Sequence, residues 1–590
     1  MNDNNEKHSV ADAQFAQGVE YSSAAFGPDM QSNYKQALSC FHAALEYYSL
    51  NETPEKWAST QQRIGLIYRS LLSGEREANL QKSLAALQIS LEVFTRDEYP
   101  VAWAKGQYEL GITYSCLYGS RRREQLGKAL SCFQASLDIF THEQYPLEWA
   151  LVQHELGSLY CQLPAEDRYM ALRKAIGCYE AALQVFSPVE HAHDWARTQH
   201  SLGNVYSFLP GGERQTNLEK AIIHYQAALQ VNTRAVQPRY WADAMQSIGN
   251  AYRNMPGGDI ESNLHNALTC YMSALQVYTP EHAPVEWALV QNNLGITYNL
   301  LSEGDEQERL EKAVDCFRAA LQVYTPKVYP AEWAKTQNML GLTYLDMPGG
   351  NLQAHLQHAI ECFRAVLDIY RREQVPMAWA NIHYNLGLAY RHLSIEDQHE
   401  LQLNYQRAIE HLRAALEVYN RQISPFEWAK AQEELGNTYL DLQLGTRQEN
   451  VQMAIGCYRA ALLVYQYDYL QEEWARTQCK LGDAYREFQD QEQKPYLEYA
   501  IACYEEALRV QTRETMLQEW AQTMYVLGLA YTELSQRQTT EGEHGEKYLH
   551  EALGCYERTL QIWRTQQSEE RVRELEQHIE SARRALKERA

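Results

Sequence analysis

Cysteine and histidine are the side chains of this sequence that could act as nucleophiles or metal ligands, and the chain has 12 Cys and 19 His. Nine cysteines recur at one position of a repeating unit: Cys40, Cys132, Cys178, Cys270, Cys316, Cys362, Cys457, Cys503 and Cys555. Side chains one repeat apart lie too far from each other for a disulfide, and free Cys packs as a small apolar residue. We therefore expect buried, unreactive thiols, which are typical of a reducing compartment.

Other catalytic and metal-binding patterns are weak. His191 and His193 share one short stretch, and His154 and His200 occupy the same position of neighbouring units. A metal site needs three or four converging ligands, which neither pair provides. The Pro-Gly-Gly turns lack the Lys-Ser/Thr of a phosphate loop, and the G-x-S-x-G and H-E-x-x-H motifs are absent. The sequence therefore predicts no catalytic residue, no metal site and no cofactor.

The tryptophans reveal the unit that must position any functional residue. Each is followed by Ala, by Gly eight residues later and by Tyr eleven later, as in Trp333, Ala334, Gly341 and Tyr344. The spacing is 46 residues with one interval of 49, and the positions are Trp57, Trp103, Trp149, Trp195, Trp241, Trp287, Trp333, Trp379, Trp428, Trp474 and Trp520. At helical spacing the Trp, Gly and Tyr share one face, so we expect the indole rings to be buried. The chain is a repeat array.

Each unit is predicted to contain two helices. Helix A begins near a Pro three residues before the Trp and ends soon after the Tyr, in several units at Pro-Gly-Gly. Helix B is typified by residues 310–324, whose apolar residues recur every three or four positions. We expect a degenerate capping helix in 1–27, an array of twelve B helices and eleven Trp-bearing A helices in 28–565, and a capping helix in 566–590. Two longer A-to-B connections, 391–407 and 532–551, are expected to be loops, the second of them mobile.

Composition limits the class of partner. The chain has 53 Lys and Arg against 76 Asp and Glu, a net charge of −23. This balance argues against nucleic acid and anionic membranes as partners. The sequence has no apolar run of the roughly 18 residues that a membrane span needs, and its first ten residues contain no apolar h-region of the kind found in signal peptides. We therefore expect a cytoplasmic protein with a protein or peptide partner.

The repeated residues resemble a known family. Leu340-Gly341-x-x-Tyr344, followed by Ala359-x-x-x-Phe363, resembles the L-G-x-x-Y and A-x-x-x-F core of tetratricopeptide (TPR) units. The 46-residue unit, with residues 217–225 (NLEKAIIHY) as an example, is similar to the repeats that accompany CHAT caspase-like peptidase domains in bacteria. The resemblance implies an all-α fold, a TPR-like α-solenoid forming a right-handed superhelix of helix-turn-helix repeats. It also implies a non-catalytic interaction scaffold. The alternatives are a regulatory or sensor partner of a separately encoded peptidase or other effector, and a self-assembling structural array.

In TPR proteins the A helices line a concave groove, which here would display the residues two, five and twelve positions after each Trp. These columns are rich in Arg, Asn and Tyr, which suit carboxylates and backbone carbonyls of an extended segment. We therefore infer a basic groove and an acidic partner, with solvated helix faces as the alternative. The predicted groove residues are Lys105, Tyr108, His154, Arg197, His200, Asn204, Asn250, Arg253, Asn292, Asn293, Asn299, Lys335, Asn338, Tyr384 and Arg391. By the same resemblance, Asn250, Asn293 and Lys335 match part of a clamp for a C-terminal carboxylate.

Overall fold

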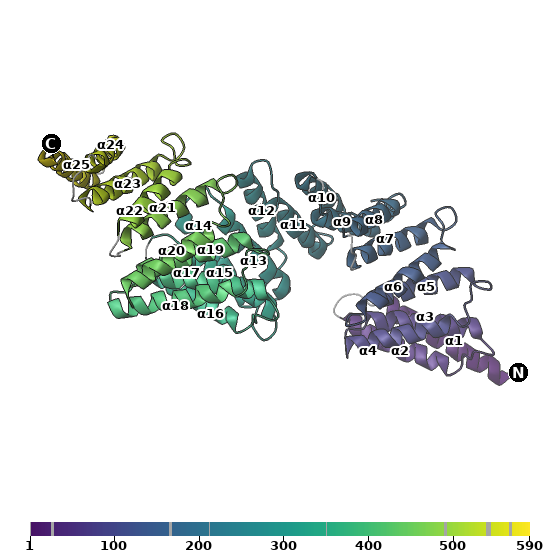
Figure 1. Ribbon diagram of the computed structural model, residues 1–590. Helices are drawn as coiled ribbons and strands as arrows, with labels where there is room; N and C mark the ends of the chain where they lie inside the picture. The colour runs from purple at the N-terminus through teal and green to yellow at the C-terminus, as the bar shows by residue number, and fades with distance from the viewer. Residues whose placement is uncertain are drawn as a thin grey trace. The chain divides into compact units, whose positions relative to one another are not determined.

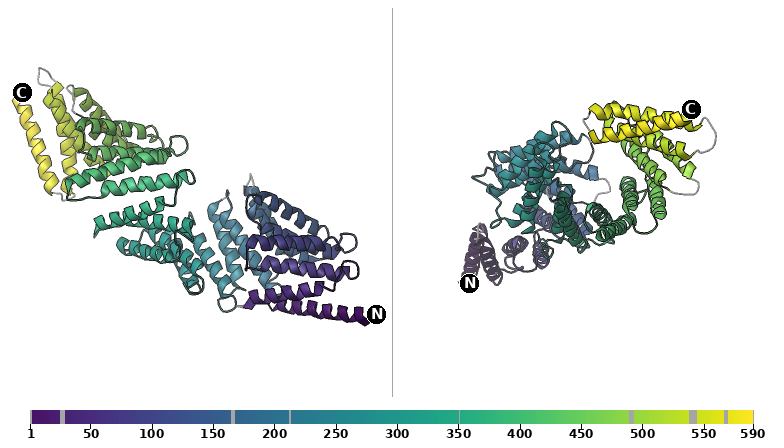
Figure 2. Two further views of the ribbon diagram at one scale, coloured as in Figure 1. Left: turned by 90° about the horizontal axis from the view of Figure 1, so that it is seen from below. Right: turned by 90° about the vertical axis from the view of Figure 1, so that its left-hand side faces the viewer.

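The computed structural model describes residues 2–24, 29–163, 168–211, 213–349, 351–488, 493–537, 544–565 and 569–589. Over these ranges the chain forms 25 α-helices and no strand, so the fold is all-α (Figure 1). Contacts between helices divide the chain into two units, Met1–Asn293 and Leu294–Ala590. Within each unit, consecutive helices pair and the pairs follow one another in chain order (Figure 2). None of the described helices is both long and apolar enough to span a membrane.

The predicted A helices are all present, and eight of them begin at the Pro that precedes the Trp. Pro is favoured there because the first turn of a helix needs no N–H donor from it. The A helices are α1 (Asn2–Ser23), α3 (Pro54–Ser70), α5 (Pro100–Ser115), α7 (Pro146–Gln162), α9 (Ala192–Phe208), α11 (Pro238–Arg253), α13 (Pro284–Leu300), α15 (Pro330–Asp346), α17 (Pro376–His392), α19 (Pro425–Asp441), α21 (Gln471–Glu487) and α23 (Leu517–Arg537).

The B helices alternate with the A helices along the chain. They are α2 (Met30–Leu45), α4 (Arg76–Ser90), α6 (Arg122–Leu137), α8 (Arg168–Ala182), α10 (Arg214–Leu229), α12 (Ile260–Ala274), α14 (Glu306–Leu321), α16 (Leu352–Leu367), α18 (Gln398–Leu416), α20 (Arg447–Ala461), α22 (Gln493–Ala507) and α24 (His544–Thr565). The last helix, α25 (Glu569–Arg589), packs against α24 through Leu575, Ile579 and Ala582. The predicted C-terminal helix is thus present and amphipathic.

The repeated Gly explains how closely the two helices of a pair approach. A Cβ atom on Gly341 would lie 2.7 Å from Cε1 of Phe363, a fully buried ring of the following B helix. The same contact occurs between Gly18 of α1 and Phe41 of α2. Helix α1 therefore packs as an A helix, although it lacks the Trp of the other A helices.

The Trp residues are less buried than predicted. All eleven indole rings are half-buried, whereas the Ala that follows each Trp is fully buried. Trp149 and Trp195, for example, pack along the edge of a small cluster formed by Ala150, Ala182 and Phe186. The sequence predicted that Trp, Gly and Tyr share the buried face, but the most deeply buried position is that of the Ala that follows the Trp, and the larger indole ring remains partly exposed.

The two longer connections are mostly helix rather than loop. Helix α18 begins at Gln398, and its 19 residues exceed the 15 or 16 of a typical B helix, which absorbs the insertion expected in 391–407. The Asp397 side chain caps this helix by accepting hydrogen bonds from the backbone N–H groups of His399 and Glu400. Similarly, α23 extends to Arg537 and α24 begins at His544, and the expected mobile segment between them lies outside the described residues.

Candidate functional site

Neighbouring A helices are joined by polar contacts that use several of the predicted groove residues. Arg253 donates to Oδ1 of Asn293 at 2.9 Å, and Asn299 donates to Oγ1 of Thr343 at 2.7 Å. The predicted residue Arg391 of α17 donates to Glu434 at 3.1 Å. These side chains connect one A helix to the next, so the fold itself uses the hydrogen-bonding capacity assigned to a ligand.

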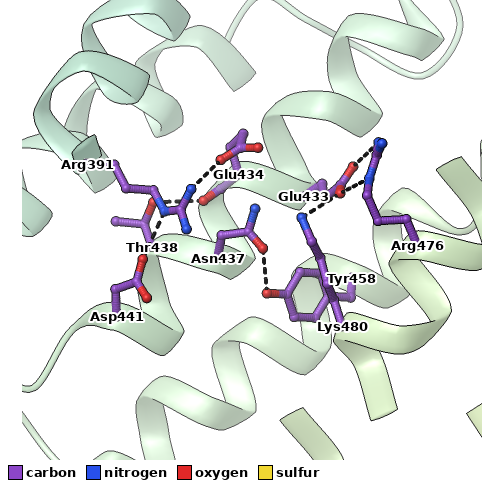
Figure 3. Close-up of polar contacts among 9 residues, drawn as sticks. All are labelled: Arg391, Glu433, Glu434, Asn437, Thr438, Asp441, Tyr458, Arg476 and Lys480. Atoms are coloured by element: carbon purple, nitrogen blue, oxygen red, sulfur yellow. Dashed lines mark hydrogen bonds and ion pairs between the residues drawn. The ribbon is translucent and has the colours of Figure 1, made fainter. Parts of the chain in front are cut away.

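The A helices α17, α19 and α21 of the second unit show this most clearly (Figure 3). Arg391 also donates to Asp441 at 2.9 Å, and Arg476 and Lys480 both donate to Glu433, at 3.1 and 2.8 Å. The Glu433 side chain is 3% exposed. Burial alone would raise the pKa of Glu433, but Lys480 and Arg476 outweigh it and the pKa is lowered. In this network the positive charges of Arg391, Arg476 and Lys480 are therefore neutralised by carboxylates of α19.

Asn204 and Asn250 have a structural role that the sequence analysis missed. Each lies nine residues after a Trp and accepts a hydrogen bond at 2.8 Å from a buried Tyr of its own B helix, Tyr225 and Tyr271 respectively. The corresponding contact from Tyr458 to Asn437 is visible in Figure 3. Because Asn250 and Asn293 both have partners within the chain, the residues proposed for a carboxylate clamp are already engaged.

The remaining predicted groove residues fall into three groups. His154 is 4% exposed and its Nδ1 lies 2.8 Å from Oγ1 of Thr198, so it is a core residue. Lys105 and Lys335 are exposed. The half-buried residues are Tyr108, Arg197, His200, Asn292, Asn338 and Tyr384. Two members of this last group, Arg197 and His200, lie together at a cavity.

This cavity, of about 160 Å³, lies in the first unit between α9, α11 and the end of α10. Its lining is polar and comprises His193, Arg197, His200, Ser201, Asn232, Tyr240 and Asp243. Tyr240 is 47% exposed and His193 is also exposed, so the cavity opens toward solvent beside them. We call it the Asn232 cavity.

The repeat explains why a cavity forms here. Four residues after the last core position of helix B, ten of the twelve units carry an aromatic residue, for example Phe140, Phe186 and Tyr278. Nine of these ten rings are almost fully buried, and Tyr370 is half-buried. The two exceptions are Asn232 and Gln511. A carboxamide is much smaller than a phenyl ring, so Asn232 leaves unfilled the space that an aromatic side chain fills elsewhere.

Three groups at the Asn232 cavity have unused hydrogen-bonding capacity. Asn232 is 6% exposed, and its carboxamide forms no hydrogen bond with the described part of the chain. The ring nitrogens of His200 likewise have no hydrogen-bond partner within the described ranges, and the buried Nε–H of Arg197 has no acceptor there. Among these three groups, the Nε–H of Arg197 is the one shielded from solvent, and a buried polar group without a partner calls for an explanation such as a ligand or water. The contrasting residue Gln511 is satisfied, because it accepts from Oγ1 of Thr523 at 2.6 Å.

The charges around this cavity are predominantly negative. Arg197 is engaged by Glu155 at 3.1 Å and Asp194 at 3.4 Å. Asp243 accepts a hydrogen bond from the Tyr278 hydroxyl but forms no ion pair with any described residue. Burial raises the pKa of Glu155, an effect that Arg197 partly offsets. If Glu155 is not counted, the carboxylates of Asp194 and Asp243 still outnumber the single guanidinium of Arg197 at this cavity.

Three cysteines of the repeated position are largely shielded from solvent, and this burial shifts their pKa. Burial raises the pKa of Cys132, Cys178 and Cys270 to about 11 in each case, which disfavours the nucleophilic thiolate. Among the residues described, no group of three or more His, Cys, Asp or Glu is arranged to hold a metal ion.

No protein-family model and no curated protein matches this sequence. Solved structures with a similar succession of helices include the human IFIT1 dimer with m7Gppp-AAAA, at 14% identity and a TM-score of 0.36 over 90% of this chain and 98% of that chain. The Cut9–Hcn1 hetero-tetramer of APC/C matches at 14% identity and a TM-score of 0.32, over 91% and 95%. The TPR domain of P58(IPK) matches at 14% and 0.22, over 72% and 99%. By its own paired helices, this chain is a repeated helix-turn-helix array of the all-α solenoid class.

Proposed function

We propose that this chain is a non-catalytic scaffold that binds a segment of a partner protein on the A-helix side of its first unit. The observation that carries the proposal is the Asn232 cavity. It combines the carboxamide of Asn232, which has no hydrogen-bond partner among the described residues, a neutral imidazole and an exposed aromatic ring on Tyr240. Aromatic residues beside buried hydrogen-bonding groups are typical anchors of protein interfaces.

The rest of the A-helix side contributes less binding capacity than its composition suggests. Arg391, Arg253 and Arg476 are held by Glu434, Asn293 and Glu433. A ligand carboxylate would have to displace these contacts, and it would gain little, because ion pairs exchanged between partners are nearly balanced in free energy. The acidic partner predicted from the sequence therefore depends on the exposed residues Lys105 and Lys335.

The proposal is tested by capture of partners from a lysate of the source cells with three forms of the chain. Wild type is compared with Tyr240→Ala and with the double variant Lys105→Glu/Lys335→Glu, and captured proteins are identified by mass spectrometry. We expect Tyr240→Ala to lose the partner that wild type retains, and the circular dichroism melt to stay unchanged because this ring is 47% exposed.

The double variant separates the two expectations about charge. Loss of the partner by Lys105→Glu/Lys335→Glu together with retention by Tyr240→Ala would support an acidic partner bound elsewhere and contradict the Asn232 cavity as the docking site. Equal capture by all three forms would contradict binding on the A-helix side altogether.

A further inference from the structure

We propose that the Asn232 cavity binds a primary ammonium group, and that in the scaffold function it receives a lysine side chain of the partner segment. This inference rests on the proposed function for its biological setting. The chemistry of the cavity is a separate matter and can be tested with small compounds alone.

Three residues that line the cavity can accept hydrogen bonds. Asp243 receives the Tyr278 hydroxyl on Oδ1, which leaves Oδ2 available. Asn232 offers its carboxamide oxygen. Burial lowers the pKa of His200, although Asp243 opposes this, so the ring is neutral at physiological pH and one nitrogen can accept. An ammonium group carries three N–H donors, which matches these three acceptors.

The charge at the cavity favours a cation as the ligand. Among the described residues that line it, Arg197 has the single guanidinium, and this group is already bound by Glu155 and Asp194. On α11, Arg239 is directed to Glu286 in an ion pair and is largely exposed. The carboxylate of Asp243 is therefore left without a cation, and it is the group that would compensate the desolvation of a bound ammonium. A carboxylate ligand would instead meet Asp243 as a like charge.

The shape of the cavity suits a narrow side chain. The cavity of about 160 Å³ is lined by Asn232, which stands where ten other units carry an aromatic ring. A lysine side chain is long and narrow, and its methylene stem can lie against apolar surface while the charged end reaches a polar site. At the opening, the rings of Tyr240 and His193 lie edge to face with centroids 5.9 Å apart, and they offer a surface for that stem.

The test uses the full chain and four small probes that differ only in the side chain. They are the N-acetyl methylamides of lysine, norleucine, arginine and glutamate, and binding is followed by saturation-transfer NMR, which detects weak ligands. We expect only the lysine compound to bind measurably, because norleucine has the stem without the ammonium group. Stronger binding of the arginine or glutamate compound than of the lysine compound, or binding of none, would overturn the inference.

Two variants assign the signal to this cavity. Asn232→Phe restores the residue found at Phe140 and Phe186, so it should fill the cavity, abolish lysine binding and leave the thermal midpoint unchanged or higher. Asp243→Asn keeps the shape but removes the charge, and we expect it to weaken the lysine compound about tenfold. The matched control is Gln511→Phe, which makes the same replacement in the second unit and should leave binding unchanged.

The outcomes distinguish this inference from the proposed function. If Tyr240→Ala abolishes partner capture while no amine probe binds, the scaffold function stands and the ammonium site is refuted. If the lysine compound binds and Asn232→Phe abolishes it, the site is supported even where capture from the lysate fails. Lysine binding that persists in Asn232→Phe would place the ligand elsewhere and overturn the assignment.

Discussion

At the scale of single residues, two positions of the repeat change together from unit to unit: the aromatic residue of helix B and the helix A residue that lies beside it. In seven units the residue nine positions after the Trp of helix A matches the ring of helix B, being a polar acceptor opposite four Tyr residues and apolar opposite three Phe residues. Tyr556 is an exception, because its unit has Leu529 at that position and its hydroxyl contacts that of Thr532 at 3.0 Å instead. The polar pairs are Tyr225 with Asn204, Tyr271 with Asn250, Tyr458 with Asn437 and Tyr504 with Asp483. The apolar pairs are Phe133 with Ile112, Phe317 with Ile296 and Phe363 with Leu342. These Asn residues therefore serve the Tyr hydroxyl.

This pairing predicts a non-additive mutational effect. Tyr271→Phe should destabilise the chain by about 1 kcal/mol, because Asn250 loses its donor at a half-buried position. Adding Asn250→Leu recreates the combination of Phe363 with Leu342 and should recover most of the loss. Urea unfolding of the two single variants and the double variant measures this. If the two losses simply add, the pairing has no energetic basis.

A second residue-scale prediction concerns His154. Burial, reinforced by Arg197, lowers the pKa of His154 from 6.5 to about 3, so the folded chain keeps this ring neutral where the unfolded chain protonates it. Stability from this site is complete above pH 6.5 and falls as the pH decreases toward 3, by up to about 1.4 kcal/mol per pH unit. Thermal midpoints measured between pH 7 and pH 5 should therefore fall less steeply for His154→Gln than for wild type. Parallel pH profiles would contradict the buried neutral state.

Some of these residue roles were readable from the sequence and others were not. The Tyr–Asn pairing could have been found by comparing, unit by unit, the Tyr or Phe of helix B with the residue nine positions after the Trp of helix A. The Asn residues considered alone suggest groups that bind a ligand. Likewise, the absence of an aromatic residue at Asn232 is visible in the sequence. That Asn232 lines a cavity, and that the amide of Gln511 is bonded to Thr523, are visible only in the structure. Such contacts depend on three-dimensional distances that spacing does not provide.

At the scale of helices, the approach of A and B within a pair is set by Gly. Gly341→Ala should destabilise the second unit by about 1–3 kcal/mol, because the new Cβ would lie 2.7 Å from the buried ring of Phe363. The matched control is Gly456→Ala in α20, where no atom lies within 4 Å and the better helix propensity of Ala should stabilise by up to about 1 kcal/mol. Chemical denaturation of both variants compares them. Equal changes in the free energy of unfolding would show that helix propensity, rather than the contact with Phe363, determines the effect of Gly341→Ala.

The helices themselves followed from local sequence signals, with instructive exceptions. The prolines marked the starts of eight A helices, because that residue is tolerated in a first turn and disfavoured inside a helix. The extra residues before Ala408 were expected in a loop, yet they extend α18, since Asp397 supplies a cap and the added residues are compatible with a helix. The number of inserted residues was predictable from the repeat spacing. Their helical conformation was not, because it depends on the cap that Asp397 provides. The half-burial of the Trp rings also escaped prediction, because a helical face does not specify which of its residues is central.

At the scale of the whole molecule, the net charge of −23 acts on every approaching partner. The Arg and Lys residues of the A-helix side are largely compensated by nearby carboxylates, so they do little to reverse this field. A long-range field changes association rates, whereas contacts at a buried site change mainly dissociation rates. The sign of the partner charge can therefore be obtained from kinetics, independently of which residues it touches.

The corresponding prediction uses a fluorescent peptide of alternating lysine and serine and stopped-flow mixing. Its association rate should fall about tenfold or more between low and high ionic strength, because salt screens the attraction within a Debye length of about 10 Å at 0.1 M. A peptide with glutamate in place of lysine should associate slowly at low salt and faster as salt is added. Asp243→Asn should raise the dissociation rate of the lysine peptide while leaving the slope of its association rate with salt almost unchanged, since one charge in 23 contributes little to the distant field. A salt-independent association rate would mean that the acidic surface does not guide the partner, and that recognition at the Asn232 cavity is local from the first encounter.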